Sequence, residues 1–418
     1  MKIIIIGAGL GGLSAAYCFA RLRHDVDVYE RRKTLSANGG SLSARPSASR
    51  ILHTWGLAAE LERIANRTSS IILREIETGD ILTEIASSDD SDYPHWGTTR
   101  EELVKLFYSK AIEAGASVHF ECTVLDVRDD IHQAYMVLKN GTTISGDMIL
   151  AADGIHSRTR YRILSDLNCP LEPVVSSITA YGFKLDALQV MKHLETSNLT
   201  ENLCSNVWMG KDLFAVSRYS VKGQHLTILC HCTHAATDQK ALWDRNGDIS
   251  HVREDFGGAC ASIRRVLQIA KSCDRWRLAE LPPLARWTSE KGRIALLGDS
   301  AHAMHPSAGQ GFSQIVEDIE VLAQLVSRDA SPASNMAWLT RMWQDIRKSR
   351  VERIQQYSKW NTYRLLNGTS LLYGSQPLAW NPSQQHSINY EDFKTPEFVK
   401  WTLEYDAEKE ASVSLSRS

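Results

Sequence analysis

The first thirty residues carry a hydrophobic pattern that predicts a strand, a turn, a helix and a second strand. Ile3 to Ile6 form an unbroken apolar run after Lys2, which is typical of a strand buried on both faces. A segment rich in Ala and Leu follows, and Val26 to Tyr29 form a second short strand. This order predicts that the chain begins with neighbouring strands of a parallel sheet.

Two further apolar runs end in turns that carry a carboxylate. Met148 to Ala152 lead into Asp153, and Ile294 to Leu297 lead into Asp299. Residues 175–281 hold several β-like segments, with 243–269 expected to be helical. From about residue 333 the chain is a helix rich in Arg and Trp, and residues 410–418 are expected to be a frayed tail. The pattern predicts an α/β fold with a sheet-rich second domain and a C-terminal helical region.

The first predicted turn has the frame Gly-x-Gly-x-x-Gly, formed by Gly7, Gly9 and Gly12. Gly7 permits the tight turn, Gly9 lets a pyrophosphate approach the backbone, and Gly12 lets the helix pack close to the strand. The helix start at Leu10 presents free N–H groups and a partial positive charge to the phosphates. A glycine frame alone also occurs in ordinary turns, but strand, frame and helix in this order predict a dinucleotide site.

Glu30 ends the second strand, at the distance from the glycine frame where an acidic residue meets the adenosine ribose. A carboxylate there accepts hydrogen bonds from the ribose hydroxyls and disfavours the 2′-phosphate of NADP. Arg31 follows directly and is included in the predicted binding edge. The expected ligand is therefore FAD or NAD.

The composition excludes several classes of protein. The chain has 418 residues, a net charge of −2 and 43% hydrophobic residues, so a nucleic-acid partner is not expected. Its eight cysteines are scattered, and Cys230-His231-Cys232 is expected to be part of a strand rather than a metal site. No apolar stretch approaches the ~20 residues of a membrane span, and the first strand begins at the N-terminus. We therefore expect a cytoplasmic protein without a signal peptide.

Three motifs in this order resemble the single-component (class A) flavoprotein aromatic hydroxylases, the family of p-hydroxybenzoate and salicylate hydroxylases. They are GAGLGGL at 7–13, Ala152-Asp153-Gly154 with Ser157 and Arg158, and Gly298-Asp299 through Gly311. The closing segment 401–410 is similar to fungal salicylate-hydroxylase-type members. The resemblance implies a Rossmann-like, glutathione-reductase-like FAD-binding domain (1–70, 98–170 and 282–330), an inserted β-sheet-rich substrate domain (71–97 and 171–281) and a C-terminal helical region with a flexible tail (331–418).

The resemblance also implies a reaction. NADPH or NADH would reduce non-covalently bound FAD, O2 would form the flavin C4a-hydroperoxide, and one oxygen would pass to a phenolic or electron-rich aromatic small molecule of secondary metabolism. Epoxidation of an indole or alkene natural product is the alternative within the same chemistry. A flavin halogenase would need a Trp-x-Trp-x-Ile-Pro segment, which the sequence lacks. A redox-sensing dinucleotide-binding module is the non-enzymatic alternative, and a homodimer stays open.

Several residues of the third motif receive roles at the flavin. Asp299 would meet a ribityl hydroxyl of FAD, or would only cap the following turn. Gly309 and Gly311 would present helix-start N–H groups to the N1–C2=O edge, where reduction adds negative charge. Pro306 would line the oxygen-reacting face of the ring, or would be an ordinary loop proline.

Two charged residues elsewhere are also assigned to the cofactor. Arg100 matches a family arginine that reaches the cofactor, or is a solvated arginine at the start of a helix. Asp153 would shape the pyrophosphate end of the site and the approach of the nicotinamide, or would only form a turn.

Lys184 and Tyr219 are expected to orient the substrate oxygen from strands that cover the flavin. The alternatives are a lysine in solvent and a tyrosine packed in the core, and His231 and His305 are reserve candidates. Lys184 stands where relatives often have an arginine, and lysine is a point charge rather than a bidentate carboxylate clamp. This difference argues against a substrate like salicylate.

Overall fold

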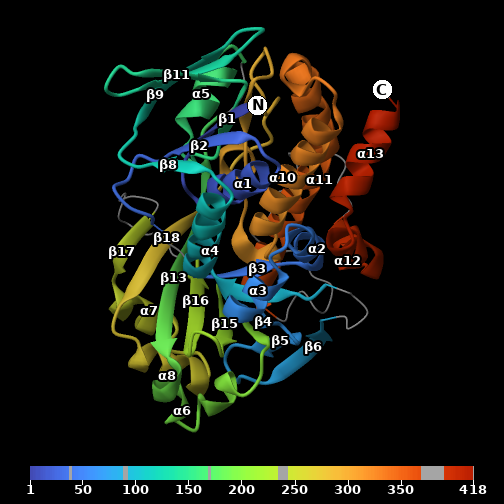
Figure 1. The fold of residues 1–418 in the computed structure, drawn as a ribbon. Coiled ribbons are helices and arrows are strands. Elements are labelled where there is room, and N and C mark those ends of the chain that lie inside the picture. Colours follow the sequence, from blue (N-terminus) through green and yellow to red (C-terminus); the bar gives the residue numbers. More distant parts are fainter. Residues whose placement is uncertain (37–39, 88–92, 168–170, 234–242, 369–389, 418) are drawn as a thin grey trace.

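A five-stranded parallel sheet occupies the upper half of the molecule in Figure 1, with the strand order β19-β12-β1-β2-β8. The structure is a computed structural model and describes residues 1–36, 40–87, 93–167, 171–233, 243–368 and 390–417. The strands are β1 (Lys2–Ile6), β2 (Asp25–Tyr29), β8 (Ser117–His119), β12 (Met148–Ala151) and β19 (Ile294–Leu296). Because neighbouring parallel strands share one carboxyl edge, the turns after β1, β12 and β19 lie at the same side of the sheet.

The central strand β1 is buried because both faces of the sheet are covered. A Cβ built on Gly12 would lie 3.3 Å from the Ile5 side chain, and one built on Gly146 would lie 3.1 Å from the Ile4 side chain. Ile4 and Ile5 point to opposite faces. A helical layer therefore covers one face and a three-stranded meander covers the other. These layers are α1 (Leu10–Arg21), with α4 (Arg100–Glu113) and α10 (Gly311–Arg328) packed on it, and β9 (Val124–Asp129), β10 (Ala134–Leu138) and β11 (Thr143–Gly146).

A second sheet, of eight strands, lies below the first (Figure 1), with the order β17-β18-β13-β16-β15-β14-β5-β6. All of its pairings are antiparallel except that of β14 with β5. Its segments, 70–86 and 174–280, lie almost wholly inside the ranges predicted for the substrate domain. The strands are β5 (Ser70–Glu75), β6 (Ile81–Ala86), β13 (Val174–Asp186), β14 (Ser205–Met209), β15 (Leu213–Ser220), β16 (His225–Cys232), β17 (Trp243–Gly247) and β18 (Cys273–Glu280).

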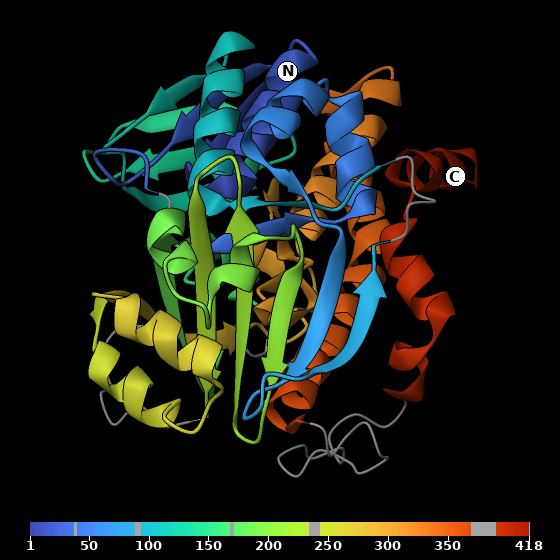
Figure 2. The same cartoon turned by 90° about the horizontal axis from the view of Figure 1, so that it is seen from below.

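The two faces of this sheet pack against different elements. Three helices cover the outer face, and α7 and α8 appear in yellow beside the strands in Figure 2. They are α6 (Ala187–Met191), α7 (Ile249–Asp255) and α8 (Ala261–Ile269). The inner face, with Phe214 and Val207, packs against Leu365 of the long helix α11.

The prediction of a helix over 243–269 is corrected at its start, because 243–247 is strand β17.

A small sheet with the order β3-β7-β4 lies between the two larger ones. At its end, Thr99 caps α4: its side chain accepts a hydrogen bond from the amide of Glu102, whose carboxylate accepts one from the amide of Thr99. The elements of this region are β3 (Ser41–Ala44), β4 (Asn66–Arg67), β7 (Trp96–Thr99), α2 (Pro46–Thr54) and α3 (Ala58–Ile64).

The described C-terminal segment 390–417 is helical as far as Arg417, so the predicted frayed tail is wrong. Ala407 and Ala411 are 2% and 0% exposed, and Arg328 of α10 pairs with Glu408 at 2.9 Å. Residues 369–389 lie outside the described residues. The remaining helices are α5 (Arg158–Leu164), α9 (Asp299–His302), α11 (Pro332–Leu366), α12 (Pro396–Leu403) and α13 (Ala407–Arg417), with 3-10 turns η1 (Ser197–Thr200), η2 (Pro306–Ala308) and η5 (Tyr390–Lys394). No helix in the described ranges is long and apolar enough to cross a membrane.

Candidate active site

A cavity of ≈ 420 Å³ lies between the carboxyl ends of the parallel strands and the inner face of the eight-stranded sheet. Its walls come from parts of the chain that are far apart in sequence. The lining includes Gly9, Leu10, Gly11, Ser43, Arg45, His95, Arg100, Phe214, Arg218, His231, Asp299, Pro306, Gly309, Gly311, Tyr357 and Arg364. One end is therefore built by the glycine turn and the other by the substrate sheet and α11.

The glycine turn after β1 has two tight positions and one open position. A Cβ on Gly7 would lie 2.6 Å from the carbonyl oxygen of Ala152, and one on Gly12 would lie 1.9 Å from the carbonyl oxygen of Gly7. A Cβ on Gly9 would meet nothing within 4 Å, and Gly9 lines the cavity beside Leu10. The open space lies at the N-terminus of α1, where a pyrophosphate can approach the free amides.

Glu30 follows β2 and is buried beside this turn. Its carboxylate accepts hydrogen bonds from the amides of Ala8 and Arg32, both at 2.9 Å. These bonds fix the glycine turn against the end of β2, and each oxygen keeps acceptor capacity for a ribose hydroxyl. Arg31 is exposed, and neither residue is among those that line the cavity. Their contact with the adenosine stays a prediction.

The third motif lines the cavity with a carboxylate, a proline and open amides. Asp299 begins α9 and is exposed to the cavity. Pro306 begins the turn η2, and Gly309 follows that turn with φ +60°, a conformation that favours glycine. Gly311 opens α10, and a Cβ on it would meet nothing within 4 Å. The N-terminus of an 18-residue helix thus faces the cavity through an open backbone.

Of the two other predicted cofactor residues, Arg100 lines the cavity and Asp153 does not. Arg100 begins α4 and lines the cavity. Asp153 lies after β12, where one carboxylate oxygen accepts hydrogen bonds from the amide and hydroxyl of Thr159. The other oxygen is buried and has no hydrogen-bond partner among the described residues. The lining contains its neighbours Ala152 and Gly154 rather than Asp153 itself.

The expected orienting pair, Tyr219 and Lys184, does not line the cavity. Tyr219 is 6% exposed and belongs to the outer core of the sheet, beside Phe183 and Leu226. Lys184 is in register with Thr227 on the inner side but is exposed to solvent. The prediction that this pair orients the substrate is therefore wrong. Because side chains alternate between the two faces along β15, Tyr219 points to the outer face of the sheet and its neighbour Arg218 points to the inner face.

Two arginines that the sequence analysis did not single out face the cavity instead. Arg218 donates hydrogen bonds to Ser205 Oγ at 2.9 Å, to Ser43 Oγ at 3.1 Å and to the Leu42 carbonyl at 3.0 Å. Arg45 donates from Nη2 to the Ala308 carbonyl at 3.0 Å. Burial and the charge of Arg45 lower the pKa of Arg218 to about 10, and burial lowers the pKa of Arg45. Arginine side chains stay protonated in proteins at neutral pH.

Two histidines add unpartnered nitrogens to the same cavity. His95 and His231 are 7% and 2% exposed, and His231 stacks on Phe214 at 4.1 Å between ring centroids. Burial lowers the pKa of His231 to about 3, with a smaller effect of His305, and holds the pKa of His95 well below its usual range. Nε2 of His95 and both ring nitrogens of His231 have no hydrogen-bond partner in the described ranges. Both rings are thus neutral hydrogen-bonding groups.

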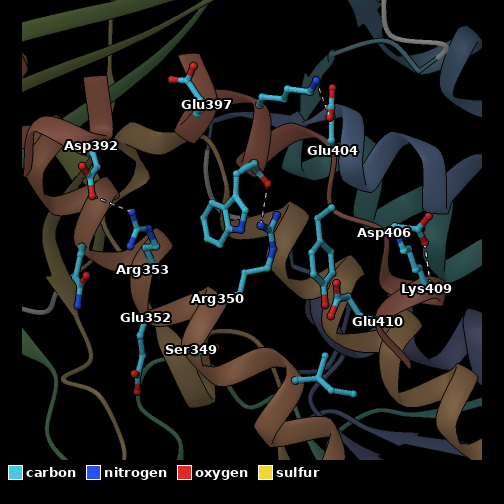
Figure 3. A pocket seen from close by; sticks show the side chains of 15 residues that line it. Ser349, Arg350, Glu352, Arg353, Asp392, Glu397, Glu404, Asp406, Lys409 and Glu410 are labelled. Atoms are coloured by element: carbon cyan, nitrogen blue, oxygen red, sulfur yellow. Dashed lines mark hydrogen bonds and ion pairs between the residues drawn. The ribbon is translucent and has the colours of Figure 1, made fainter. Parts of the chain in front are cut away.

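A second, larger hollow of ≈ 950 Å³ lies between α11 and the C-terminal helices (Figure 3). Its arginines already have partners: Arg350 donates to the Trp401 carbonyl at 3.1 Å, and Arg353 pairs with Asp392 at 3.5 Å. Arg350 also reaches the buried Glu317 at 2.8 Å. This hollow lies away from the strand ends, and its side chains hold helices together.

The cofactor end of the first cavity fits an extended FAD. Gly9 and Gly311, whose backbones have open space around them, and the carboxylate of Asp299 all line this one cavity. The model of the FAD binding domain family matches residues 1–328. The chain belongs to this family. The resemblance inferred from the three motifs is confirmed at the level of family and fold.

Relatives of this FAD binding domain protein cover nearly the whole chain. The FAD-dependent monooxygenase OpS4 of Beauveria bassiana is 28% identical over 416 residues, which is 97% of this chain and 95% of the relative. The 6-hydroxynicotinate 3-monooxygenase of Bordetella bronchiseptica is 25% identical, over 88% of this chain and 92% of the relative. A crystal structure of CtdE in complex with FAD and substrate has a TM-score of 0.84 at 21% identity, covering 100% of this chain and 98% of that one. A salicylate hydroxylase substrate complex has a TM-score of 0.79 at 19% identity, covering 99% and 98%. These structures establish the fold.

Proposed function

We propose that this protein is a FAD-dependent monooxygenase that uses NAD(P)H and O2 to hydroxylate a phenolic or otherwise electron-rich aromatic small molecule. One observation carries the proposal: a single cavity joins the cofactor end, at Gly9, Asp299 and Gly311, to an apolar sheet face. Relatives named as monooxygenases, one of them as FAD-dependent, support the same reaction class.

The residues of the chain bind and orient the reactants. Asp299 would accept hydrogen bonds from the ribityl chain of FAD, and the N-terminus of α10 at Gly311 would stabilise negative charge on the flavin. Reduced FAD supplies the activation of O2. Leu73, Val207 and Phe214 on the sheet exclude water and hold an aromatic ring near the flavin.

The test begins with the purified protein. It should be yellow and release FAD, not FMN, on denaturation. A screen of aromatic compounds should find some that stimulate NAD(P)H oxidation and yield a product heavier by one oxygen atom. Characterisation of that product separates ring hydroxylation from epoxidation of an indole or alkene. Protein that binds no flavin, or that oxidises NAD(P)H without ever transferring oxygen to any compound, contradicts the proposal.

A further inference from the structure

The loop that leads into α10 has two glycines with a buried glutamine between them. Gly309 and Gly311 line the cavity, and a Cβ on Gly311 would meet nothing within 4 Å. Gln310 is 2% exposed and is not part of the cavity lining. Glycine allows more backbone conformations than any other residue, so amides in this loop keep one direction only if something holds the loop. The side chain of Gln310 is placed to do so.

A chain of hydrogen bonds runs from Gln310 into the protein interior. Oε1 of Gln310 accepts a hydrogen bond from Nε2 of Gln314 at 3.4 Å, and the backbone amide of Gln314 donates to the Gln310 carbonyl at 2.9 Å. Oε1 of Gln314 accepts a hydrogen bond from Nη2 of Arg347 at 2.8 Å. Gln314 and Arg347 are both 0% exposed, so bulk water does not compete for these bonds. The loop at the cavity is thereby connected to α11.

Arg347 is a fixed end for this chain because each of its three guanidinium nitrogens has a partner. Nε donates to Asp318 and Nη1 donates to Glu317, each at 2.8 Å, and Nη2 donates to Gln314. The guanidinium is a planar fork with fixed donor directions, and breaking a buried ion pair is costly. Helices α10 and α11, which pack against each other (Figure 1), are joined here. Gln314 therefore receives its hydrogen bond from a rigidly held group.

The same network reaches the short helix that carries Asp299. His302, the last residue of α9, has its Nε2 at 2.7 Å from Oδ2 of Asp318, whose other oxygen holds Arg347. Helix α9 begins at Asp299, which lines the cavity. Two parts of the proposed flavin site, the carboxylate of α9 and the first amides of α10, are thus tied to one buried group of side chains.

A glutamine on α10 can also serve stability alone. Gln324 donates to Glu320 at 2.7 Å, and neither residue lines the cavity. The bond between Gln314 and Gln310 differs because it ends in the cavity loop. Oriented donors act most strongly where charge develops, and they act best when they need no reorganisation. Because a flavin gains negative charge on reduction, a loosened loop should weaken the binding of reduced FAD more than that of oxidised FAD.

We propose that Gln310 and Gln314 are positioning residues that hold the first amides of α10 toward the flavin and thereby favour its reduced state. The inference rests on the proposed function and concerns how the same site is prepared for reduction by NAD(P)H. Arg347 anchors the chain of hydrogen bonds. Neither glutamine lines the cavity, so both act through the backbone of the loop.

The test measures the midpoint potential of FAD in the purified holoenzyme, and it needs no substrate. The protein is reduced slowly without oxygen beside a reference dye. We expect Gln310→Met and Gln314→Met each to lower the affinity for reduced FAD relative to oxidised FAD about tenfold, which lowers the potential by about 30 mV. The double variant should shift no further than Gln314→Met alone, because both residues belong to one chain. The matched control Gln324→Met, on the same helix, should keep the wild-type potential.

Melting temperatures are recorded in parallel, because loss of stability alone would not distinguish the variants from the control. Wild-type potentials in both Gln310→Met and Gln314→Met overturn the inference, as do an equal shift in Gln324→Met or shifts that add in the double variant. If Gln314→Met does not fold, Gln310→Met at the cavity loop decides. A wild-type protein without flavin would contradict the proposed function, whereas bound flavin with unaltered potentials would contradict this inference alone.

Discussion

In the glycine turn, one glycine is needed for folding and another for binding the cofactor. Gly12 lies where any Cβ would collide with the Gly7 carbonyl, whereas Gly9 has open space around it. We expect Gly12→Ala to lower the thermal stability of the protein even without FAD. Gly9→Ala should leave the melting temperature of the apoprotein nearly unchanged but weaken FAD binding, because the methyl group occupies the pyrophosphate position. Differential scanning fluorimetry and a fluorescence titration with FAD check both; equal effects of the two substitutions on apoprotein stability would contradict the assignment.

Asp299 is the residue on which retention of the flavin should depend most. Asp299→Ala should weaken FAD binding by roughly 1–3 kcal/mol, because it removes charge-assisted hydrogen bonds to the ribityl chain. Asp166→Ala is the control, since Asp166 is a surface carboxylate that pairs with Arg286 at 2.9 Å. FAD affinity is measured by quenching of flavin fluorescence. Identical affinities in both variants would remove Asp299 from the cofactor site.

At the scale of elements, local signals in the sequence predicted structure well where neighbouring residues decide it. Thr99 followed by Glu102 is a local signal for a helix start and forms the capping box of α4, and Asn140-Gly141, a pair typical of tight hairpin turns, joins β10 to β11. Strand β17 was missed because it is defined by pairing with β18, about thirty residues away. The local strand or helix preferences of residues 243–247 carry no information about that pairing.

The substrate site was missed for a related reason. Successive side chains of a strand point to opposite faces of the sheet. A choice that is wrong by one residue therefore takes a side chain of the core for one that lines the cavity. The sequence drew attention to Tyr219, whereas the register places Arg218 in the cavity. The alternation of Phe214, Val216 and Arg218 was visible in the sequence, but the sequence did not indicate which face would be the inner one.

Helices α10 and α11 are joined by a buried ionic network. Arg347 pairs with Glu317 and Asp318, each at 2.8 Å, and all three side chains are 0% exposed. We expect Arg347→Met to lower the free energy of unfolding by about 3–5 kcal/mol, because it leaves buried carboxylates without their full partner set. Arg353→Met on the same helix breaks a half-exposed pair with Asp392 and should cost about 0–1 kcal/mol. Urea denaturation measures both, and similar losses would contradict a structural role of the network.

At the scale of the whole molecule, the neutral buried histidines predict how stability depends on pH. The folded pKa of His231 is about 3, well below its usual value. Between that value and about 6.5 the unfolded chain binds a proton that the folded chain does not. Stability should therefore rise with pH across this window, by up to about 1.4 kcal/mol per pH unit for each such histidine, and level off above it.

Substitution identifies the histidine responsible. Urea denaturation of the wild type and of His231→Phe is compared from pH 5 to 7, above the range where most carboxylates titrate. His231→Phe should flatten the slope, because a phenylalanine can stack on Phe214 without a proton to bind. His156→Gln, at an exposed position, should leave the slope as it is. An unchanged slope in His231→Phe would show that this ring is not kept neutral by the fold.

The order of strands in the parallel sheet also constrains biosynthesis. β1 and β2 are made first, but β12, which pairs with β1, follows only at residue 148, and β19, which pairs with β12, follows only at residue 294. At a synthesis rate of about 5–20 residues per second, roughly 15–60 s separate Gly9 from Asp299 on the ribosome. During that interval the nascent chain holds half of a flavin site and an unpaired sheet edge, which is β1 until β12 is made and β12 afterwards. Loading of the cofactor is therefore a late event, completed only after Gly311, at about three-quarters of the 418-residue chain, has been made.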